Sequence, residues 1–448
     1  MDLKLKKIGT YEILLLFFFF AFFFPSFRGV VGRAGSILVN GGLIMLLGMY
    51  LVLYKGKIKF LSKPEKRVAL LFFVVFGYYA LAIVGSTLFL STQVVFNDLF
   101  EVHRPLLYTL SFLLPFATIQ SPHDIQKLER VLFAVCGALI VLSLVQLSGI
   151  ASPLFHLYTR PANVDSLQVT GSFIAPYDMA FVMSLFLFHS ISLTLFRRRF
   201  GYFFLTLLVG LIVVLTQSRS VVGAVLVGLG LMLPIAIALP TLHRLVRLKV
   251  DKSLVRLALI SFLLLCLGTY LYLTYSEQLN YLIHGFKRVL AGQSLGPLEG
   301  RIAQWNFAME QARSSWLVAL FGNGPSKEIM SLVESIYTYH VFRYGFLGLG
   351  IVFVVPAIVG IVFAGKVLLN RSVSASYWPM YIGILAWLLI MPIAAIGNNL
   401  VEQIRISFLY HFLLGCLVRS YYIWSAEKST AASSHRLTSC DSAQNGSI

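Results

Sequence analysis

The stretch 9–26, GTYEILLLFFFFAFFFPS, decides the fold class of this chain. From Ile13 to Phe24 it holds only apolar side chains, and the whole stretch is long enough to cross roughly 30 Å of hydrocarbon as a helix. In a bilayer every backbone donor and acceptor must find a partner within the protein, so a continuous apolar run of this kind forms a helix. Three lysines precede the run and no small-residue cleavage site follows it. This combination indicates an uncleaved signal anchor.

Similar apolar runs recur along the whole chain. Its 448 residues are 58% hydrophobic and only 12% charged, and the mean hydropathy of +0.83 lies outside the range of soluble domains. We therefore predict an all-α integral membrane protein with about twelve transmembrane helices and one long helical loop. The predicted spans are 9–26, 35–54, 68–90, 105–119, 131–149, 173–195, 201–216, 221–241, 257–275, 346–365, 377–397 and 404–422.

These spans divide the chain into regions. Residues 1–275 hold the spans up to 257–275, and residues 276–345 form the long loop, where we expect the active site. Residues 346–424 hold the remaining spans. Residues 425–448 are rich in Ser, Thr and Ala without apolar periodicity, which predicts a disordered cytoplasmic tail.

Basic residues set the orientation of the spans. With the N-terminus in the cytoplasm, most Lys and Arg lie on the cytoplasmic side, including the clusters at 55–67, 197–199 and 244–256, as the positive-inside rule requires. Both termini are then cytoplasmic, and the long loop is periplasmic or extracellular. Contact with anionic membrane lipids explains most of the net charge of +18, so we expect no nucleic-acid partner. The cysteines lie in spans or in the tail, where they form no disulfide framework or zinc site.

The long loop gathers most of the groups that could carry chemistry. Within it, 300–320 has apolar side chains at helical spacing and predicts an amphipathic helix. Gly322, Gly324 and Pro325 then break the helix. A second helical stretch is predicted from Ile329 to Tyr344, running into the next span.

Arginine dominates the cations of the outer face, whereas the inner face mixes Lys and Arg. Because guanidinium forks match phosphate oxygens, this bias points to an anionic ligand, with chance or helix-end snorkelling as the alternative. Arg219 lies between two spans almost without a loop, and is either a phosphate clamp or a boundary arginine bonded to span-end carbonyls. Arg301 and Arg343 either contact the ligand or pair with loop carboxylates, for which the candidates are Glu299, Glu310 and Glu334. Arg288 and Arg160 are secondary candidates on charge and location.

The candidate proton acceptors late in the loop are Glu334 and His340. The alternatives are a solvated helix carboxylate for Glu334 and an interfacial histidine for His340. No metal-binding or nucleotide-binding spacing is present, so we expect metal-free chemistry without a cofactor. Between the last two spans, Glu402 and Arg405 have the spacing of a helical ion pair, and we expect them to bind each other rather than a substrate.

These motifs, in this order, resemble a known family. Gly300-Arg301, Trp305, Ala308, the turn 322–324, Glu334-Ser335, Tyr337 and the glycines at 345 and 348 are similar to the pattern of the O-antigen ligase and O-antigen polymerase superfamily. Ser218-Arg219 at a span end and Gly171-x-Phe173-x-x-Pro176 resemble two further features of that family. The resemblance covers about residues 171–350 and the layout of about twelve spans.

The resemblance implies a membrane glycosyltransferase of the GT-C type in the bacterial inner membrane, with its active site on the periplasmic side. Such an enzyme takes a glycan from an undecaprenyl-diphosphate-linked oligosaccharide; a chain-length regulator protein is a further candidate partner. Polymerases pass the glycan to the next lipid-linked repeat unit, and ligases pass it to lipid A-core in lipopolysaccharide biosynthesis. Ligases typically carry histidine where this chain has Glu334, so polymerase is the leading hypothesis and ligase the alternative.

In this interpretation the arginines hold the donor diphosphate and a carboxylate accepts the proton. Arg219 and Arg301 are the main diphosphate ligands, and Arg288, Arg343 and Arg160 are the secondary candidates. Glu334 is the base for the attacking hydroxyl and His340 the alternative base, and a single displacement inverts the anomeric centre. A lipid-linked oligosaccharide transporter and a non-catalytic envelope scaffold are further alternatives.

Overall fold

The computed structural model describes a helical bundle. The described residues are 9–27, 33–53, 58, 60–90, 95, 98, 101, 103–150, 152–159, 168–197, 199–242, 291, 296–330, 333–400 and 402–444. Within these ranges there are helices and no strand. The helices are α1 Thr10–Phe23, α3 Arg33–Leu53, α4 Lys63–Phe89, α6 His103–Thr118, α7 Pro122–Ser148, α8 Ser152–Phe155, α10 Pro176–Phe196, α11 Phe200–Leu215, α12 Arg219–Leu242, α15 Gly296–Ser314, α16 Trp316–Phe321, α17 Ile336–Gly348, the π-helix η3 Leu349–Val354, α18 Val355–Leu369, α19 Trp378–Ala394 and α20 Ile404–Gln444.

The prediction of an α-helical membrane protein is confirmed in its coarse form. By length and composition, 6 helical stretches of the described chain can cross a membrane, and shorter apolar helices accompany them. Each predicted span coincides with a helix except 257–275, which lies outside the described residues. The total of about twelve spans stays a prediction.

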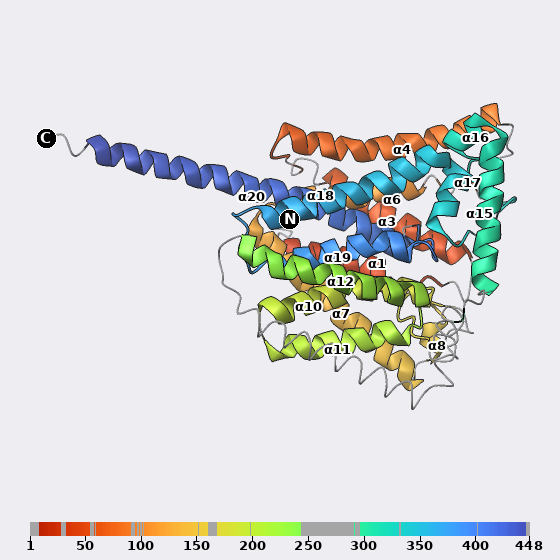
Figure 1. The fold of residues 1–448 in the computed structure, drawn as a ribbon, viewed down its shortest axis with the longest axis horizontal. Helices are drawn as coiled ribbons and strands as arrows, with labels where there is room; N and C mark the ends of the chain where they lie inside the picture. The colour runs from red at the N-terminus through yellow and green to blue at the C-terminus, as the bar shows by residue number, and fades with distance from the viewer. Residues whose placement is uncertain are drawn as a thin grey trace, which may run out of the picture.

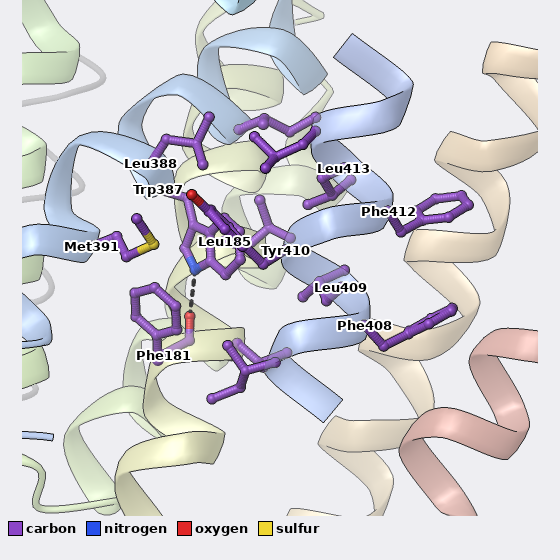
Figure 2. Packing of buried hydrophobic residues seen from close by; sticks show 14 of the residues in the cluster. Phe181, Leu185, Trp387, Leu388, Met391, Phe408, Leu409, Tyr410, Phe412 and Leu413 are labelled. Carbon is purple, nitrogen blue, oxygen red and sulfur yellow. Dashed lines mark hydrogen bonds between the residues drawn. The ribbon is translucent and has the colours of Figure 1, made fainter. Parts of the chain in front are cut away.

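The core of the bundle forms where α10 packs against α19, with Tyr410 and Leu409 of α20 beside them (Figure 2). Helix α10 is almost wholly enclosed, because 94% of its most apolar stretch is buried inside the protein. Trp387 of α19 donates its indole N–H to the carbonyl of Phe181 at 2.8 Å. Gly383 permits this close approach, because a Cβ there would lie 2.9 Å from the Cα of His189 in α10. The hydroxyl groups of Ser184, Ser190 and Thr194 in α10 donate to carbonyls of their own helix, so they add no unpaired group to the core.

A buried ion pair joins three parts of the chain in the interior of the bundle. Arg419 of α20 lies 2.9 Å from Glu65 of α4, and both side chains are 0% exposed. Arg419 also donates to the carbonyl of Ile119 and the amide oxygen of Gln120, which lie between α6 and α7. A buried guanidinium with all these acceptors fixes the relative positions of α4, α6 and α20.

Helix α15 runs across one end of the bundle, with α16 and α17 beside it, whereas α20 projects from the other end (Figure 1). Three glycines of this region have positive φ, Gly322 at 71°, Gly324 at 69° and Gly345 at 67°. At Gly345 a Cβ would lie 2.2 Å from the carbonyl oxygen of Leu320, so α16 and α17 cross in backbone contact. Tyr78 of α4 secures the crossing by donating to the carbonyl of Tyr344 at 2.5 Å.

Three local predictions differ from the structure. The predicted helix 300–320 is divided at Ser315, whose hydroxyl caps α16 by accepting from the N–H of Leu317. The predicted second helix begins at Ile336 rather than Ile329, because a turn occupies 327–329. The tail after Ser425 continues α20 as helix through Gln444 rather than being disordered. The apolar part of α20 supplies the nucleus, and extending an existing helix is far easier than starting one.

Candidate functional site

Arg301 and Glu334 meet at the end of the bundle that α15 crosses. The Nε of Arg301 lies 2.9 Å from Oε2 of Glu334, with the side chains 28% and 39% exposed. Gln304, one turn along α15, accepts a hydrogen bond from the N–H of Glu334 at 3.3 Å. The loop carboxylate that pairs with Arg301 is therefore Glu334, one of the three predicted candidates. Because the Nε edge is engaged, Glu334 fixes the plane of the guanidinium.

The same guanidinium lies beside the start of α12. A Cβ built on Gly397 would be 3.6 Å from Nη1 of Arg301 and 3.0 Å from Cβ of Ser220. The backbone at Gly397 thus lies between Arg301 and Ser220, the neighbour of Arg219. Asn398 donates to the hydroxyl of Ser220 at 2.6 Å and so holds the segment between α19 and α20 against α12. Residues 301 and 220, far apart in sequence, are brought to one place.

Arg219 is half-buried and is the first residue of α12. The N-terminus of a helix carries unpaired N–H groups and a positive dipole end, which favour anions. Because Arg219 adjoins Ser220 in the chain, we group Arg219, Ser220, Arg301, Glu334 and Asn398 as an arginine-rich corner. This corner can bind an anion with several oxygen acceptors.

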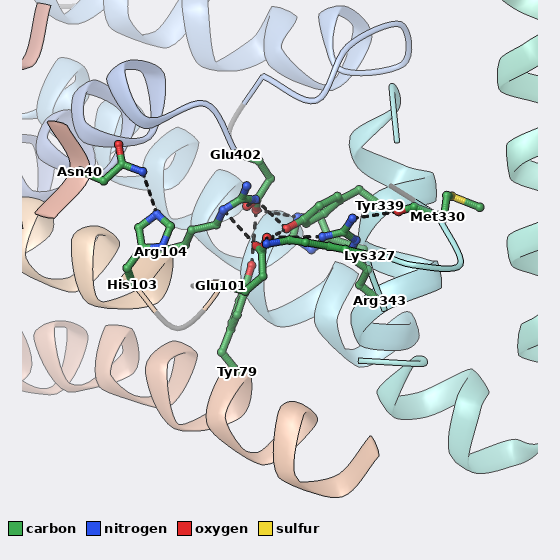
Figure 3. Close-up of polar contacts among 11 residues, drawn as sticks. Asn40, Tyr79, Glu101, His103, Arg104, Lys327, Met330, Tyr339, Arg343 and Glu402 are labelled. Atoms are coloured by element: carbon green, nitrogen blue, oxygen red, sulfur yellow. Dashed lines mark hydrogen bonds and ion pairs between the residues drawn. The ribbon is translucent and has the colours of Figure 1, made fainter. Parts of the chain in front are cut away.

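A second polar cluster lies where the segment before α6 meets α17 (Figure 3). We call it the buried ion network and define it by Glu101, Arg104, Lys327, Tyr339, Arg343 and Glu402. Glu101 lies 3.0 Å from Arg104, 2.7 Å from Lys327 and 3.5 Å from Arg343. Its other partner is Tyr339, which donates its hydroxyl at 2.9 Å.

Glu101 is ionised despite its burial. Burial alone would raise its pKa from the ordinary 4.5, but the charges of Arg104, Arg343 and Lys327 outweigh burial and lower the pKa to about 2. Asp98 adds a further carboxylate beside Lys327. It accepts a hydrogen bond from the backbone N–H of Lys327 at 3.3 Å. The carboxylates Asp98, Glu101 and Glu402 thus balance the cations. With Asp98 counted, the network has as many carboxylates as cations, and its ion pairs order the segments that it joins.

Glu402 joins the network from the connection before α20. It pairs with Arg104, accepts from the hydroxyl of Tyr79 at 3.4 Å, and lies 3.5 Å from Nε2 of His340. The predicted pairing of Glu402 with Arg405 is wrong: Arg405 donates to the backbone carbonyls of Phe22, Phe24 and Ser172. Glu402 precedes the first turn of α20, so the helical spacing between the two residues does not apply.

The remaining candidates are placed as follows. Arg343 is 3% exposed and donates to the carbonyl of Met330 at 3.1 Å; it therefore belongs to the buried ion network, and its carboxylate is Glu101 rather than a loop glutamate. His340 is 0% exposed, one helical turn from Tyr344. Arg288 and Arg160 lie outside the described residues. Throughout the described ranges no group of three His, Cys, Asp or Glu residues could hold a metal ion.

Sequence reasoning missed Glu101, Arg104 and Lys327. A usable signal was present for the first two, because a glutamate and an arginine at a spacing of three residues stand at the start of an apolar span, where unpaired charges are costly. Lys327 gave no local signal, since its carboxylate partner lies in a different part of the chain. Comparison of the sequence with protein-family models and with curated proteins gives no match.

Proposed function

We propose that this chain is an O-antigen polymerase, a metal-independent membrane glycosyltransferase that joins undecaprenyl-diphosphate-linked repeat units at the periplasmic face of the bacterial inner membrane. One observation carries the proposal: the Arg301 guanidinium, fixed by Glu334, lies beside Ser220 at the start of α12, next to Arg219. Guanidinium groups beside a helix N-terminus suit the oxygens of a diphosphate.

The arginine-rich corner serves the leaving group. When the glycosidic bond to the diphosphate breaks, negative charge accumulates on the departing phosphate oxygens. Preorganised cations stabilise that charge without having to reorganise at the moment of reaction. Arg301 is preorganised in this sense, because Glu334 accepts a hydrogen bond from its Nε. Gln304 in turn holds the backbone of Glu334 by accepting a hydrogen bond from its N–H.

Glu334 also serves as proton acceptor in this proposal. Its Oε2 accepts from Arg301, and its side chain is 39% exposed, so the carboxylate can be reached by the hydroxyl of an acceptor sugar. The hydroxyl oxygen attacks the anomeric carbon from the face opposite the diphosphate, its proton passes to Glu334, and the bond to the diphosphate breaks, which inverts the anomeric centre. His340 is the alternative base, but its burial favours Glu334 for direct contact.

Purified protein with lipid-linked repeat units as the sole substrate tests the proposal. The polymerase reaction gives a ladder of products that differ by one repeat unit. Product that forms only when lipid A-core is added would instead identify a ligase. Transbilayer movement of the substrate in vesicles without any new glycosidic bond would identify a transporter. Either of these results would refute the polymerase proposal.

A further inference from the structure

The turn between α11 and α12, residues 216–218, has an unusual backbone conformation just before Arg219. Gln217 in this turn has a φ of 55°, in the left-handed region that residues other than glycine rarely adopt. The turn is also buried, with Gln217 only 2% exposed. Such a conformation persists only where the surrounding structure holds it, and conformations of this kind gather at functional sites. The groups that hold this turn therefore help to fix the position of Arg219.

One support of the turn is the loop 168–173, which precedes α10. The N–H of Val169 donates to the carbonyl of Leu215, the last residue of α11, at 3.2 Å. Val169 is fully buried, and a hydrogen bond that is shielded from water is stronger than an exposed one. The loop is thus bonded to the chain four residues before Arg219.

A single side chain, Gln146 of α7, holds this loop in shape. Its Oε1 accepts hydrogen bonds from the N–H groups of Thr170 and Gly171, both at 2.9 Å. Its Nε2 donates to the carbonyl of Gln168 at 3.2 Å. Gly171 has a φ of 54°, which lets two successive N–H groups converge on one oxygen. The amide of Gln146 therefore satisfies three backbone groups of the loop at once.

Arg405 of α20 fastens the same loop to α1. Its guanidinium donates to the carbonyl of Ser172, and to those of Phe22 and Phe24 at the end of α1 at 2.5 Å and 2.8 Å. The dipole of α1 favours a cation at this end of the helix. Arg405 is buried, so its bonds to carbonyls stand in place of water and keep the side chain where it is. The loop is therefore tied to α7 and to α1.

We propose that Gln146 and Arg405 are positioning residues for Arg219. Each acts through the loop 168–173 and the bond of this loop to the end of α11, without touching the substrate. The inference rests on the function proposed above, in which Arg219 stabilises charge on the departing diphosphate. When either side chain is lost, the loop is released and the guanidinium of Arg219 is no longer preorganised.

A double-mutant cycle with purified protein and lipid-linked repeat units tests the inference. We expect Gln146→Leu to lower kcat, per folded protein, by roughly 10²-fold, the effect of a displacement of about 1 Å. In the Arg219→Ala background the same substitution should change kcat by no more than about twofold, because the group on which it acts is already absent. Gln126→Leu is the control and should keep the wild-type rate, since Gln126 bonds to Tyr377 at the other end of α7. An equal loss in both backgrounds, or no loss in either, would overturn the inference.

Arg405→Lys gives a second cycle with the same expected result, because lysine keeps the charge but lacks the planar fork that reaches several carbonyls. Hydrogen exchange of the wild-type protein in detergent needs neither a variant nor activity. The amides of 168–173 and 215–219 should exchange slowly, and rapid exchange of either segment would overturn the inference. Slow exchange in a wild-type protein that makes no polymer would instead refute the function on which the inference rests.

Discussion

Replacing Glu101 by glutamine is the sharpest test of the buried ion network. The substitution keeps the size of the side chain and removes the charge on which Arg104, Lys327 and Arg343 converge. The pKa of Glu101 falls from 4.5 to about 2 on folding, and at about 1.4 kcal/mol per unit this corresponds to about 3 kcal/mol of stability at pH 7. Glu101→Gln should lose about that much.

The pH dependence follows from the direction of the shift. A carboxyl group whose pKa is lowered by folding contributes fully above its unfolded pKa of 4.5, and the contribution disappears as the pH falls toward the folded value of about 2. The stability difference between wild type and Glu101→Gln should therefore shrink from about 3 kcal/mol at pH 7 to about 1 kcal/mol at pH 3.

Denaturant unfolding of the detergent-solubilised protein at the two pH values measures this difference. Glu310→Gln is the matched control, because Glu310 is an exposed glutamate on α15, and a change there should stay within about 0.5 kcal/mol. Equal stability of Glu101→Gln and wild type at pH 7, or a difference that does not vary with pH, would refute the reasoning.

Three further substitutions test the packing around the site. Tyr78→Phe loses the hydroxyl that bonds to the crossing of α16 and α17, and should lose about 1 kcal/mol in the same unfolding assay. Gly345→Ala places a Cβ against backbone at φ 67°, so its apparent Tm should fall by several degrees, whereas Gly350→Ala, where a Cβ meets nothing within 4 Å, should stay near wild type. Arg419→Met leaves Glu65 charged and buried and should lose about 3–5 kcal/mol; adding Glu65→Met should recover part of the loss, and no recovery would contradict the assigned ion pair.

Apolar runs made the helices predictable, because a bilayer or a buried core imposes length and hydrophobicity locally. The break at Gly322 was predictable for the same local reason: positive φ favours glycine. The pairing of Arg301 with Glu334 was one of several alternatives, since sequence alone does not say how α15 folds back over α17.

Contacts between distant segments could not be predicted. Glu101 and Arg343 are 242 residues apart, and no periodicity links them. The expected pair Glu402–Arg405 failed because its spacing rule requires both residues to lie in one helix, whereas Glu402 precedes α20.

The most direct test of the central claim is polymer formation from lipid-linked repeat units by purified Arg301→Ala and Arg219→Ala. Arg313→Ala is the control, because Arg313 is an exposed arginine on the same helix as Arg301. We expect each corner variant to lose roughly 10²–10³-fold in rate, the usual effect of removing one preorganised donor, while Arg313→Ala makes products at the wild-type rate. Near-normal ladders from both Arg301→Ala and Arg219→Ala, at wild-type protein levels, would contradict the account.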